Sequence, residues 1–256
     1  MTTQPAPISV QLYSLREEAA ADFEGVLRRL GSAGFVGVEL AGFHGMSTTR
    51  FNEIIAEAGL VVSSGHIGAG TADEINAALD DLAAVGCTTA ILPFLPPTEF
   101  ADLQAVQRSA DTINAAHAVA AARGFTFGYH NHFWEFRPVD DGATAWSHLI
   151  DRLDPGVVIE LDIYWAKVGG ADPISVIGDL GDRLHLLHVK DGPADSPKSP
   201  MVAVGDGVID IAGTLAAAPG AAWHIVELDR CATDMFEAVE GSYRFLVGQG
   251  LSRGRA

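Results

Sequence analysis

The stretch ADLQAVQRSADTINAAHAVAAARGFTFGYHNH, residues 101–132, contains one complete helix-and-strand unit of the fold. Its first part, 101–124, is rich in alanine and predicts an amphipathic helix that ends at Gly124, because glycine readily adopts the left-handed conformation at a helix end. Its second part, 125–132, is a short apolar run of the kind that forms buried parallel strands. The stretch therefore predicts a helix followed by a strand whose end carries His130 and His132.

The same alternation of apolar runs and longer helix-type stretches, such as 17–34, repeats along the whole chain. The apolar runs cover residues 8–15, 35–40, 60–68, 88–95, 125–132, 157–163, 184–191 and 223–229. This tally predicts an α/β fold, a (β/α)8 TIM barrel, in a single domain over residues 1–256. A doubly wound open sheet is the alternative, and it lacks the glycine-rich phosphate fingerprint expected after the first strand.

Charge and composition narrow the classes of partner. The chain has 33 acidic and 16 basic residues, a formal charge of −17, which repels nucleic-acid phosphates and anionic membranes. We therefore expect no nucleic-acid or membrane partner. The segment MTTQPAPISV lacks the features of a signal peptide, and Cys87 and Cys231 form no disulfide or CxxC pattern. We expect a cytoplasmic protein.

Polar residues gather at the ends of the last four predicted strands, where TIM barrels carry their reacting groups. In chain order they are His130 and His132, Glu160 and Asp162, His188 and Lys190, and Glu227 and Asp229. Alternate residues of a strand face the same side, so the two members of each pair point the same way. Buried charges are costly unless they are paired or bind a metal. Such a ring of polar groups predicts a common partner.

A single divalent cation is the partner that these side chains suit best. His130, Asp162, His188 and Glu227 supply one ligand from each strand, and two imidazoles with two carboxylates favour Mn2+, with Co2+, Fe2+ or Zn2+ as alternatives. For any one histidine, an ordinary core position is the better interpretation. Four metal-capable residues at matching heights favour the site. The sequence leaves open whether His130 or His132 is the ligand.

A family resemblance makes this interpretation more specific. The motifs GVEL, GYHNHFWEF, IELDIYW, LLHVKDG, VGDGVID and IVELD follow one another along the chain. In this order they resemble the sugar phosphate isomerase/epimerase family of the xylose-isomerase-like TIM barrel superfamily, which also contains endonuclease IV, ketose 3-epimerases and inosose dehydratase. The resemblance implies a metal-dependent barrel enzyme that acts on a sugar or keto-polyol.

The resemblance also assigns individual residues, with two departures. It implies Asp162, His188 and Glu227 as metal ligands. Ketose 3-epimerases place a glutamate on strand 5 that binds the metal and moves a proton, where this chain has His130. They also carry a substrate-binding histidine where Trp165 stands here. Both departures argue against proton exchange between two symmetric glutamates.

The chemistry expected of such a site is proton abstraction next to a carbonyl, with the metal stabilising an enediolate. The candidate catalytic residues are Glu227, His132, Lys190 and His66. Glu227, His132 or His66 would serve as the base. Lys190 would stabilise the oxyanion or protonate a departing oxygen, and a salt bridge to Asp191 or Asp162 is an equal alternative.

Substrate contacts are predicted for a further set of residues. They are Glu39, Trp165, Phe133 and Trp134. A buried ion pair for Glu39 and core packing for each aromatic residue are the competing interpretations. The glycine-bearing segment 204–210 is expected to lie over the pocket, as a lid or as a simple turn.

The sequence thus favours a sugar isomerase/epimerase, with a lyase or dehydratase that eliminates from a 3-keto sugar or an inosose-like substrate as the alternative. No GxxxxGK loop or basic cluster indicates a phosphorylated substrate, so a neutral sugar is expected. Endonuclease IV chemistry needs more histidines than the strand ends offer, and a non-catalytic sugar-binding barrel fits the intact ligand set poorly. The last helix, 234–250, is predicted to pack on the barrel or at the subunit contact of a homo-oligomer.

Overall fold

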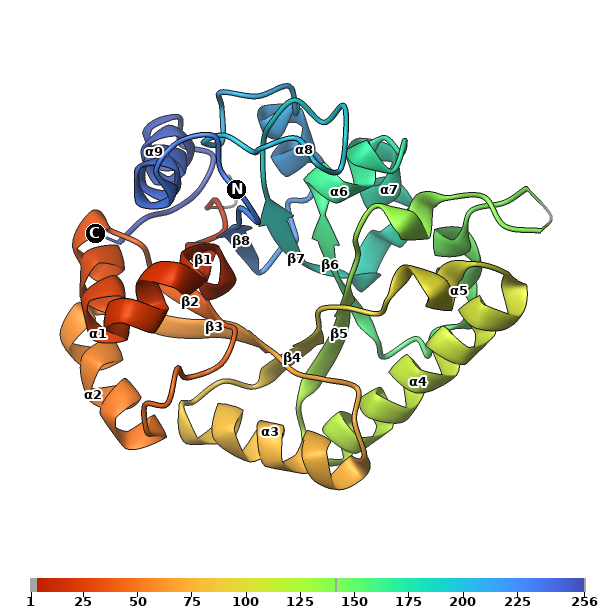
Figure 1. Cartoon of the computed structure of the whole chain (residues 1–256), viewed down its shortest axis with the longest axis horizontal. Helices are drawn as coiled ribbons and strands as arrows, with labels where there is room; N and C mark the ends of the chain where they lie inside the picture. Colours follow the sequence, from red (N-terminus) through yellow and green to blue (C-terminus); the bar gives the residue numbers. More distant parts are fainter. Residues whose placement is uncertain (1–3, 141, 256) are drawn as a thin grey trace.

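In the computed structural model, which describes residues 4–140 and 142–255, parallel strands close into a barrel (Figure 1). Each strand pairs with its neighbours in sequence, and the last pairs with the first. The eight strands found among these residues are β1 (Ile8–Gln11), β2 (Gly37–Leu40), β3 (Val61–His66), β4 (Thr89–Leu92), β5 (Thr126–His130), β6 (Val158–Asp162), β7 (Leu184–Val189) and β8 (Trp223–Val226). The predicted (β/α)8 barrel is confirmed.

Helices surround the barrel on its outer side (Figure 1). In the described part of the chain they are α1 (Arg16–Ala33), α2 (Thr48–Ala58), α3 (Ala72–Ala84), α4 (Leu103–Ala122), α5 (Ala145–Arg152), α6 (Ile163–Val168), α7 (Pro173–Leu180), α8 (Ile211–Ala217) and α9 (Met235–Gly248). Short 3-10 helices span Leu12–Leu15, Pro97–Phe100, Trp134–Phe136 and Gly181–Arg183. Two helices, α6 and α7, follow β6, so there are more helices than a strict alternation gives.

The helix ends follow the predicted glycine signals. α1 ends at Ala33, and Gly34 adopts a φ of 102° while its N–H donates to the Gly31 carbonyl. α4 ends two residues before Gly124, which has a φ of 77°. Only glycine adopts this left-handed conformation without steric cost, so these positions turn the chain toward the next strand.

Every strand is shorter than its predicted apolar run, and β1 and β8 show the reason most clearly. β1 stops at Gln11, because the Gln11 side chain accepts a hydrogen bond from the Tyr13 N–H and residues 12–15 form a 3-10 helix. β8 stops at Val226, so Glu227 follows the strand and its N–H reaches the Val189 carbonyl at 3.4 Å. Polar residues at the strand ends favour turns over continued sheet.

The barrel interior changes character along its axis. Ile91, Leu186 and Ile225 form a fully buried apolar cluster inside the barrel. Leu186 and Ile225 each lie two residues before a polar residue on the same face of their strands, His188 and Glu227. Side chains two apart on a strand share a face, so an apolar layer supports a polar layer at the carboxyl ends.

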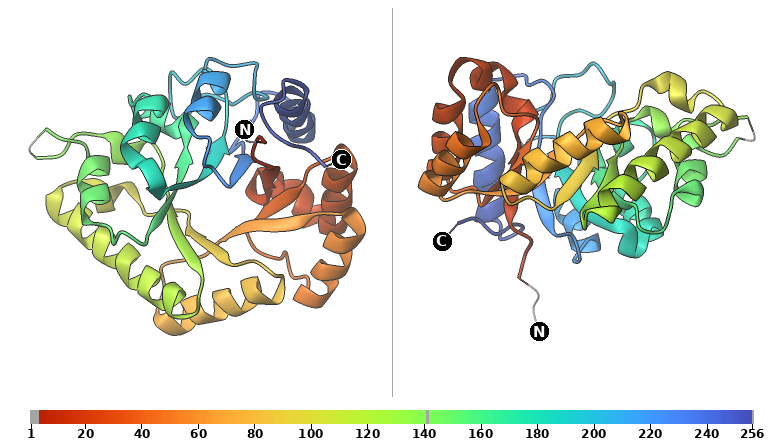
Figure 2. Two further views of the ribbon diagram at one scale, coloured as in Figure 1. Left: turned by 180° about the vertical axis from the view of Figure 1, so that it is seen from behind. Right: turned by 90° about the horizontal axis from the view of Figure 1, so that it is seen from below.

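The last helix packs within the chain. Val239 and Leu246 of α9 are fully buried, and Glu240 accepts a hydrogen bond from Arg29 of α1. Figure 2 shows the two ends of the chain at the same end of the barrel, where Ile8 and Arg253 are joined by a backbone hydrogen bond. No helix within the described residues combines the length and apolarity needed to cross a membrane.

Segment 204–210 is fastened to the end of β7 by the buried carboxylate of Asp191. This carboxylate accepts hydrogen bonds, 2.9 to 3.1 Å long, from the N–H groups of Gly192, Gly205, Gly207 and Ile209. Several convergent N–H donors on one carboxylate make a strong, directional anchor. The anchor favours the fixed-turn interpretation of this segment.

Replacing Asp191 by asparagine should destabilise the fold. An amide group loses the charge and offers only one acceptor oxygen to several N–H groups, so we expect the free energy of unfolding to fall by about 3 kcal/mol. Urea unfolding of Asp191→Asn measures this. The matched control is Asp206→Asn, an exposed residue of the same segment. Equal stability of the two variants would contradict the anchor.

Candidate active site

Strand register brings the predicted polar residues to one height at the carboxyl ends. His130 of β5 lies opposite Glu160 of β6, and Asp162 of β6 lies opposite His188 of β7. All four side chains are buried. The register therefore gathers groups from separate strands into one polar layer inside the barrel wall.

The four predicted metal ligands come together in this layer and are called here the cavity-side group. One ligand atom from each of His130, Asp162, His188 and Glu227 lies within 4.8 Å of the others. The His188 Nδ1 is 2.7 Å from a Glu227 carboxylate oxygen, and the His130 Nε2 is 3.8 Å from an Asp162 oxygen. Such spacing is compatible with a cation among them.

Lys190 lies against the same carboxylates. Its Nζ is 2.8 Å from Asp162, 2.6 Å from Glu227 and 2.8 Å from Asp229. Burial alone would lower the pKa of Lys190, but these carboxylates outweigh it and raise the pKa well above its usual value. Lys190 is therefore a buried ammonium. Of the two predicted salt-bridge partners, it contacts Asp162.

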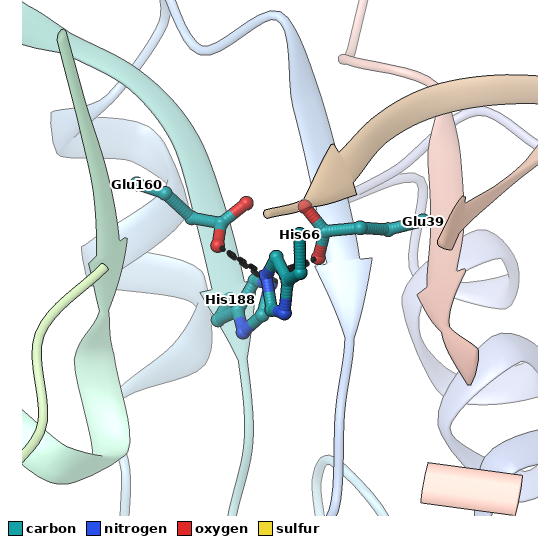
Figure 3. A group of neighbouring side chains, drawn as sticks. All are labelled: Glu39, His66, Glu160 and His188. Carbon is teal, nitrogen blue, oxygen red and sulfur yellow. Dashed lines mark hydrogen bonds and ion pairs between the residues drawn. The ribbon is translucent and has the colours of Figure 1, made fainter. Parts of the chain in front are cut away.

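A second set of side chains lies deeper in the barrel and is called here the buried group: Glu39, His66, Glu160 and His188 (Figure 3). The His188 Nε2 is 2.6 Å from a Glu39 oxygen and 3.1 Å from a Glu160 oxygen. The His66 Nε2 is 3.4 Å from Glu39 and 3.2 Å from Glu160. His188 thus belongs to both groups and connects them.

Two members of this arrangement are not among the predicted ligands or catalytic residues. Glu160 precedes Asp162 by two residues on β6 and so shares its face. Gln11 donates from its side-chain nitrogen to Glu39 at 2.8 Å and contacts His66 at 3.2 Å. The alternation of charged residues on β6 was the available signal for Glu160.

The pKa values of the two imidazoles in the cavity-side group shift in opposite directions. Burial, reinforced by the positive charges of His188 and Lys190, keeps the pKa of His130 well below its usual value. Burial would also lower the pKa of His188, but Glu160, Glu227 and Glu39 together raise it well above the usual value. Both ring nitrogens of His188 face carboxylates, at 2.7 Å from Glu227 and 2.6 Å from Glu39.

The pKa values of the carboxylates also shift in opposite directions. Burial raises the pKa of Asp162 to about 6, even though Lys190 and His188 oppose the change. Burial alone would raise the pKa of Glu227, but Lys190 and His188 lower it by more. The pKa of Glu227 therefore lies well below its usual value. In the buried group, burial and the charge of Glu160 raise the pKa of Glu39. The layer is a tightly coupled charge network.

Asn131, which lies between His130 and His132, has a structural role that differs from the roles of the two histidines. The Asn131 side-chain oxygen accepts from the Asp162 N–H at 2.9 Å, and its side-chain nitrogen donates to the Asp162 carbonyl at 3.2 Å. These bonds continue the pairing of β5 with β6 beyond the strand ends. Asn131 thereby fixes the backbone that carries His130, His132 and Asp162.

His132 lies at the edge of the site, against an aromatic wall. Its ring stacks on Trp134 at 4.3 Å with an interplanar angle of 11°. Trp165 lies 6.4 Å from the same ring and 5.5 Å from Phe133. Burial, with His130 adding to it, keeps the pKa of His132 well below its usual value. His132 is thus a neutral imidazole held by aromatic packing.

A cavity of about 720 Å³ opens beside these groups. It is lined by Tyr13, Ala41, Gly42, His66, Ile67, Gly68, Ala69, Leu92, Pro93, Phe94, His130, His132, Glu227 and Asp229. Of the predicted catalytic residues, His66, His132 and Glu227 reach it. Apolar walls with a few convergent polar groups are typical of a small-molecule site.

The predicted substrate-binding residues lie behind this lining. Trp134 and Trp165 are buried next to the His132 ring, Phe133 is partly buried beside them, and Glu39 is fully buried in contact with His188. Their contact with substrate stays a prediction. Phe94, which the sequence did not single out, is 49% exposed and meets His132 edge-on at 5.4 Å.

The chain's own residues fit a divalent cation. Two imidazoles and two carboxylates each offer one ligand atom, and these atoms lie within 4.8 Å of one another. Imidazole nitrogens and carboxylate oxygens are the ligands that Mn2+, Fe2+, Co2+ and Zn2+ accept. The donor set does not distinguish among these metals.

A protein-family model described as "Xylose isomerase-like TIM barrel" matches residues 27–229, more than half of the chain. The chain belongs to this family. The predicted resemblance to the xylose-isomerase-like TIM barrel superfamily is therefore confirmed. Among curated proteins, none matches the chain.

Solved structures agree with this assignment. A sugar phosphate isomerase/epimerase from Parabacteroides distasonis is 25% identical, with a TM-score of 0.83, and the match covers 98% of this chain and 97% of that one. An L-ribulose 3-epimerase is 16% identical, with a TM-score of 0.70 and coverage of 96% and 94%. A probable 3-DHS dehydratase from Bacillus anthracis is 13% identical, with a TM-score of 0.72 and coverage of 94% and 98%. The last two similarities show the fold alone.

The buried carboxyl of Glu135 provides a pH-dependent test of the site's scaffold. It accepts hydrogen bonds from the Tyr129 hydroxyl at 2.7 Å and the His132 N–H at 3.0 Å, and burial raises its pKa to about 7. Ionisation is thus harder in the folded than in the unfolded chain. This group's contribution to stability is present at low pH and lost as pH rises toward 7.

Glutamine mimics the protonated carboxyl, so Glu135→Gln should gain stability relative to the unchanged protein as pH rises. The difference in free energy of unfolding should shift by about 3 kcal/mol between about pH 4.5 and pH 8. Urea unfolding across this range measures it. The exposed Glu17→Gln variant should show no such trend. A pH-independent difference for Glu135→Gln would contradict the raised pKa.

Proposed function

We propose that this protein is a divalent-metal-dependent sugar isomerase/epimerase that abstracts a proton next to the carbonyl of a ketose or keto-sugar. The observation that carries the proposal is the cavity-side group, whose members His130 and Glu227 also line the cavity. Membership in the xylose isomerase-like family supports the same class. A neutral sugar is the substrate that we propose, since none of the cavity-lining residues is Lys or Arg.

His130, Asp162, His188 and Glu227 would hold the cation, and Mn2+ is the ion that we propose among those that this donor set accepts. When bound, a divalent cation polarises a carbonyl oxygen and stabilises the negative charge that develops on it. The fully buried Lys190 ammonium lies next to the same carboxylates and adds positive charge at this point. Its Nζ is held between Asp162, Glu227 and Asp229, so it is not the base that we propose.

His132 is the base that we propose. It lines the cavity, and its Nδ1 has no hydrogen-bond partner among the described residues. Glu227 is less suited, because its carboxylate is engaged by Lys190 and His188. Burial would lower the pKa of His66, but Glu39 and Glu160 raise it, so His66 is a proton donor to a substrate hydroxyl.

Elimination from a 3-keto sugar or an inosose-like substrate is the second candidate. The position of the carboxylates along the cavity favours it over epimerisation, because Glu227 and Asp229 both follow β8, whereas His66 ends β3 and His130 ends β5. Epimerisation by two carboxylates, one on each face of the substrate, does not fit this lining. One base with an imidazole donor fits isomerisation and elimination equally.

The proposed activity should depend on metal. Protein treated with a chelator should lose turnover, and Mn2+ should restore it, because polarisation of the carbonyl supplies a large part of the catalysis. Ketoses and 3-keto-glycosides form the substrate panel, with chromatography of the products. Interconversion of ketoses supports the first candidate. Release of an unsaturated sugar without ketose interconversion would replace it with the lyase.

Variants should separate the two histidines. His132→Gln should bind metal normally but lower kcat by roughly 100-fold or more, the range for loss of a general base. His130→Gln should lose metal as well as activity. His185→Gln, at the amino end of β7, is the control for substitution of a barrel histidine. Metal loss in His132→Gln with retention in His130→Gln would reverse the two roles.

A further inference from the structure

The two ring nitrogens of His188 face two different carboxylates. Its Nδ1 lies 2.7 Å from Glu227 on the cavity side, and its Nε2 lies 2.6 Å from Glu39 on the buried side. Figure 3 shows the ring between Glu39 and Glu160, with His66 beside it. The ring can therefore use one nitrogen toward the cavity while the other is held from below.

Glu39 is itself held firmly by residues of the two neighbouring strands. Its Oε1 accepts from the Ser64 hydroxyl at 2.7 Å, and its Oε2 accepts from the Gln11 side-chain nitrogen at 2.8 Å. Gln11 belongs to β1 and Ser64 to β3, and all three side chains are fully buried. A buried carboxylate fixed by two donors is a rigid acceptor for the His188 ring.

We propose that Glu39 is a positioning residue that orients His188 for the cation, and this rests on the metal site of the proposed function. A ligating imidazole must present a lone pair on one nitrogen and keep a proton on the other. A carboxylate behind the ring accepts that proton's hydrogen bond, fixes the tautomer and makes the ligating nitrogen more basic. Here Glu39 would keep the proton on Nε2 and leave Nδ1 for the cation beside Glu227.

The alternative, that the buried group holds a cation of its own, is less consistent with the contacts. Both oxygens of Glu39 already accept hydrogen bonds from Ser64, Gln11 and His188. Of the four members of the buried group, only His66 lines the cavity, whereas His130 and Glu227 of the cavity-side group both do. A cation that receives substrate oxygens needs coordination positions open to the cavity.

Metal affinity and stoichiometry test the proposal without relying on turnover. The chelator-treated unchanged protein is titrated with Mn2+ in competition with a metal indicator, alongside Glu39→Gln and Ser64→Ala. We expect one ion per chain in all three, a Kd about 10- to 100-fold weaker in Glu39→Gln, and a smaller weakening in Ser64→Ala. Glu135→Gln is the matched control, a fully buried glutamate that contacts Tyr129 and His132 instead of His188, and its Kd should not change.

The visible spectrum of the Co2+ forms adds a second readout. In Glu39→Gln the absorption bands of bound Co2+ should keep their intensity, because the same ligands stay and the coordination number does not change. The positions of the bands should shift, because the donor strength of the His188 nitrogen changes. Thermal unfolding of the metal-free proteins checks that the variants are folded. If Glu39→Gln does not fold, Ser64→Ala decides, because it removes one donor to Glu39 and leaves the carboxylate in place.

Three results would contradict this inference or its foundation in distinguishable ways. An unchanged Kd in folded Glu39→Gln, or in Ser64→Ala when that variant decides, would exclude the positioning role. Two ions in the unchanged protein and one in Glu39→Gln would make Glu39 a ligand of a separate site. No Mn2+ binding by the unchanged protein would remove the metal site itself, and with it the proposed function.

Discussion

The structure depends on how the barrel accommodates carboxylates that are withdrawn from water. Glu39, Glu160, Asp162 and Glu227 all lie in the polar layer, each at most a few per cent exposed. Placing one such charge in a protein interior without a partner is prohibitive. Lys190, His66 and His188 lie among these carboxylates, and the carboxylates raise the pKa values of all three side chains. Each charge is tolerable only because of its neighbours.

This interdependence explains the layering of the site. The apolar cluster of Ile91, Leu186 and Ile225 closes the barrel below. Above it, the buried group and then the cavity-side group follow, joined through the His188 ring. The polar residues therefore lie above a packed apolar layer and do not surround an open pore. Chemistry is confined to the side where the cavity admits a small molecule.

The fold and the list of strand-end residues were predictable because each follows from a local pattern. Buried strands appear as short apolar runs, and the two-residue alternation tells which side chains share a face. On this basis His130, Asp162, His188 and Glu227 were expected together, and the structure brings them together. The roles of Glu39 and Gln11 were not predictable. They depend on a side-chain hydrogen bond between β1 and β2 and on the contact of Glu39 with His188 across the barrel interior, neither of which leaves a mark in the local sequence.

Strand ends were also less predictable than strand centres. The sequence extended β1 to residue 15, whereas the Gln11 side chain caps a 3-10 helix and ends the strand. That difference matters for function, because it turns Tyr13 toward the cavity. A single side-chain-to-backbone hydrogen bond decides it, and such local competition is not visible in hydrophobic periodicity.

Asn131 has a consequence beyond its two hydrogen bonds. Because its amide binds the main chain of Asp162 rather than the carboxylate, this pairing of β5 with β6 does not depend on the side chain at position 162. In this contact the scaffold and the reactive group are decoupled. A lineage of such barrels can exchange the functional group there while the framework that presents it persists, which is a physical basis for one architecture serving many reactions.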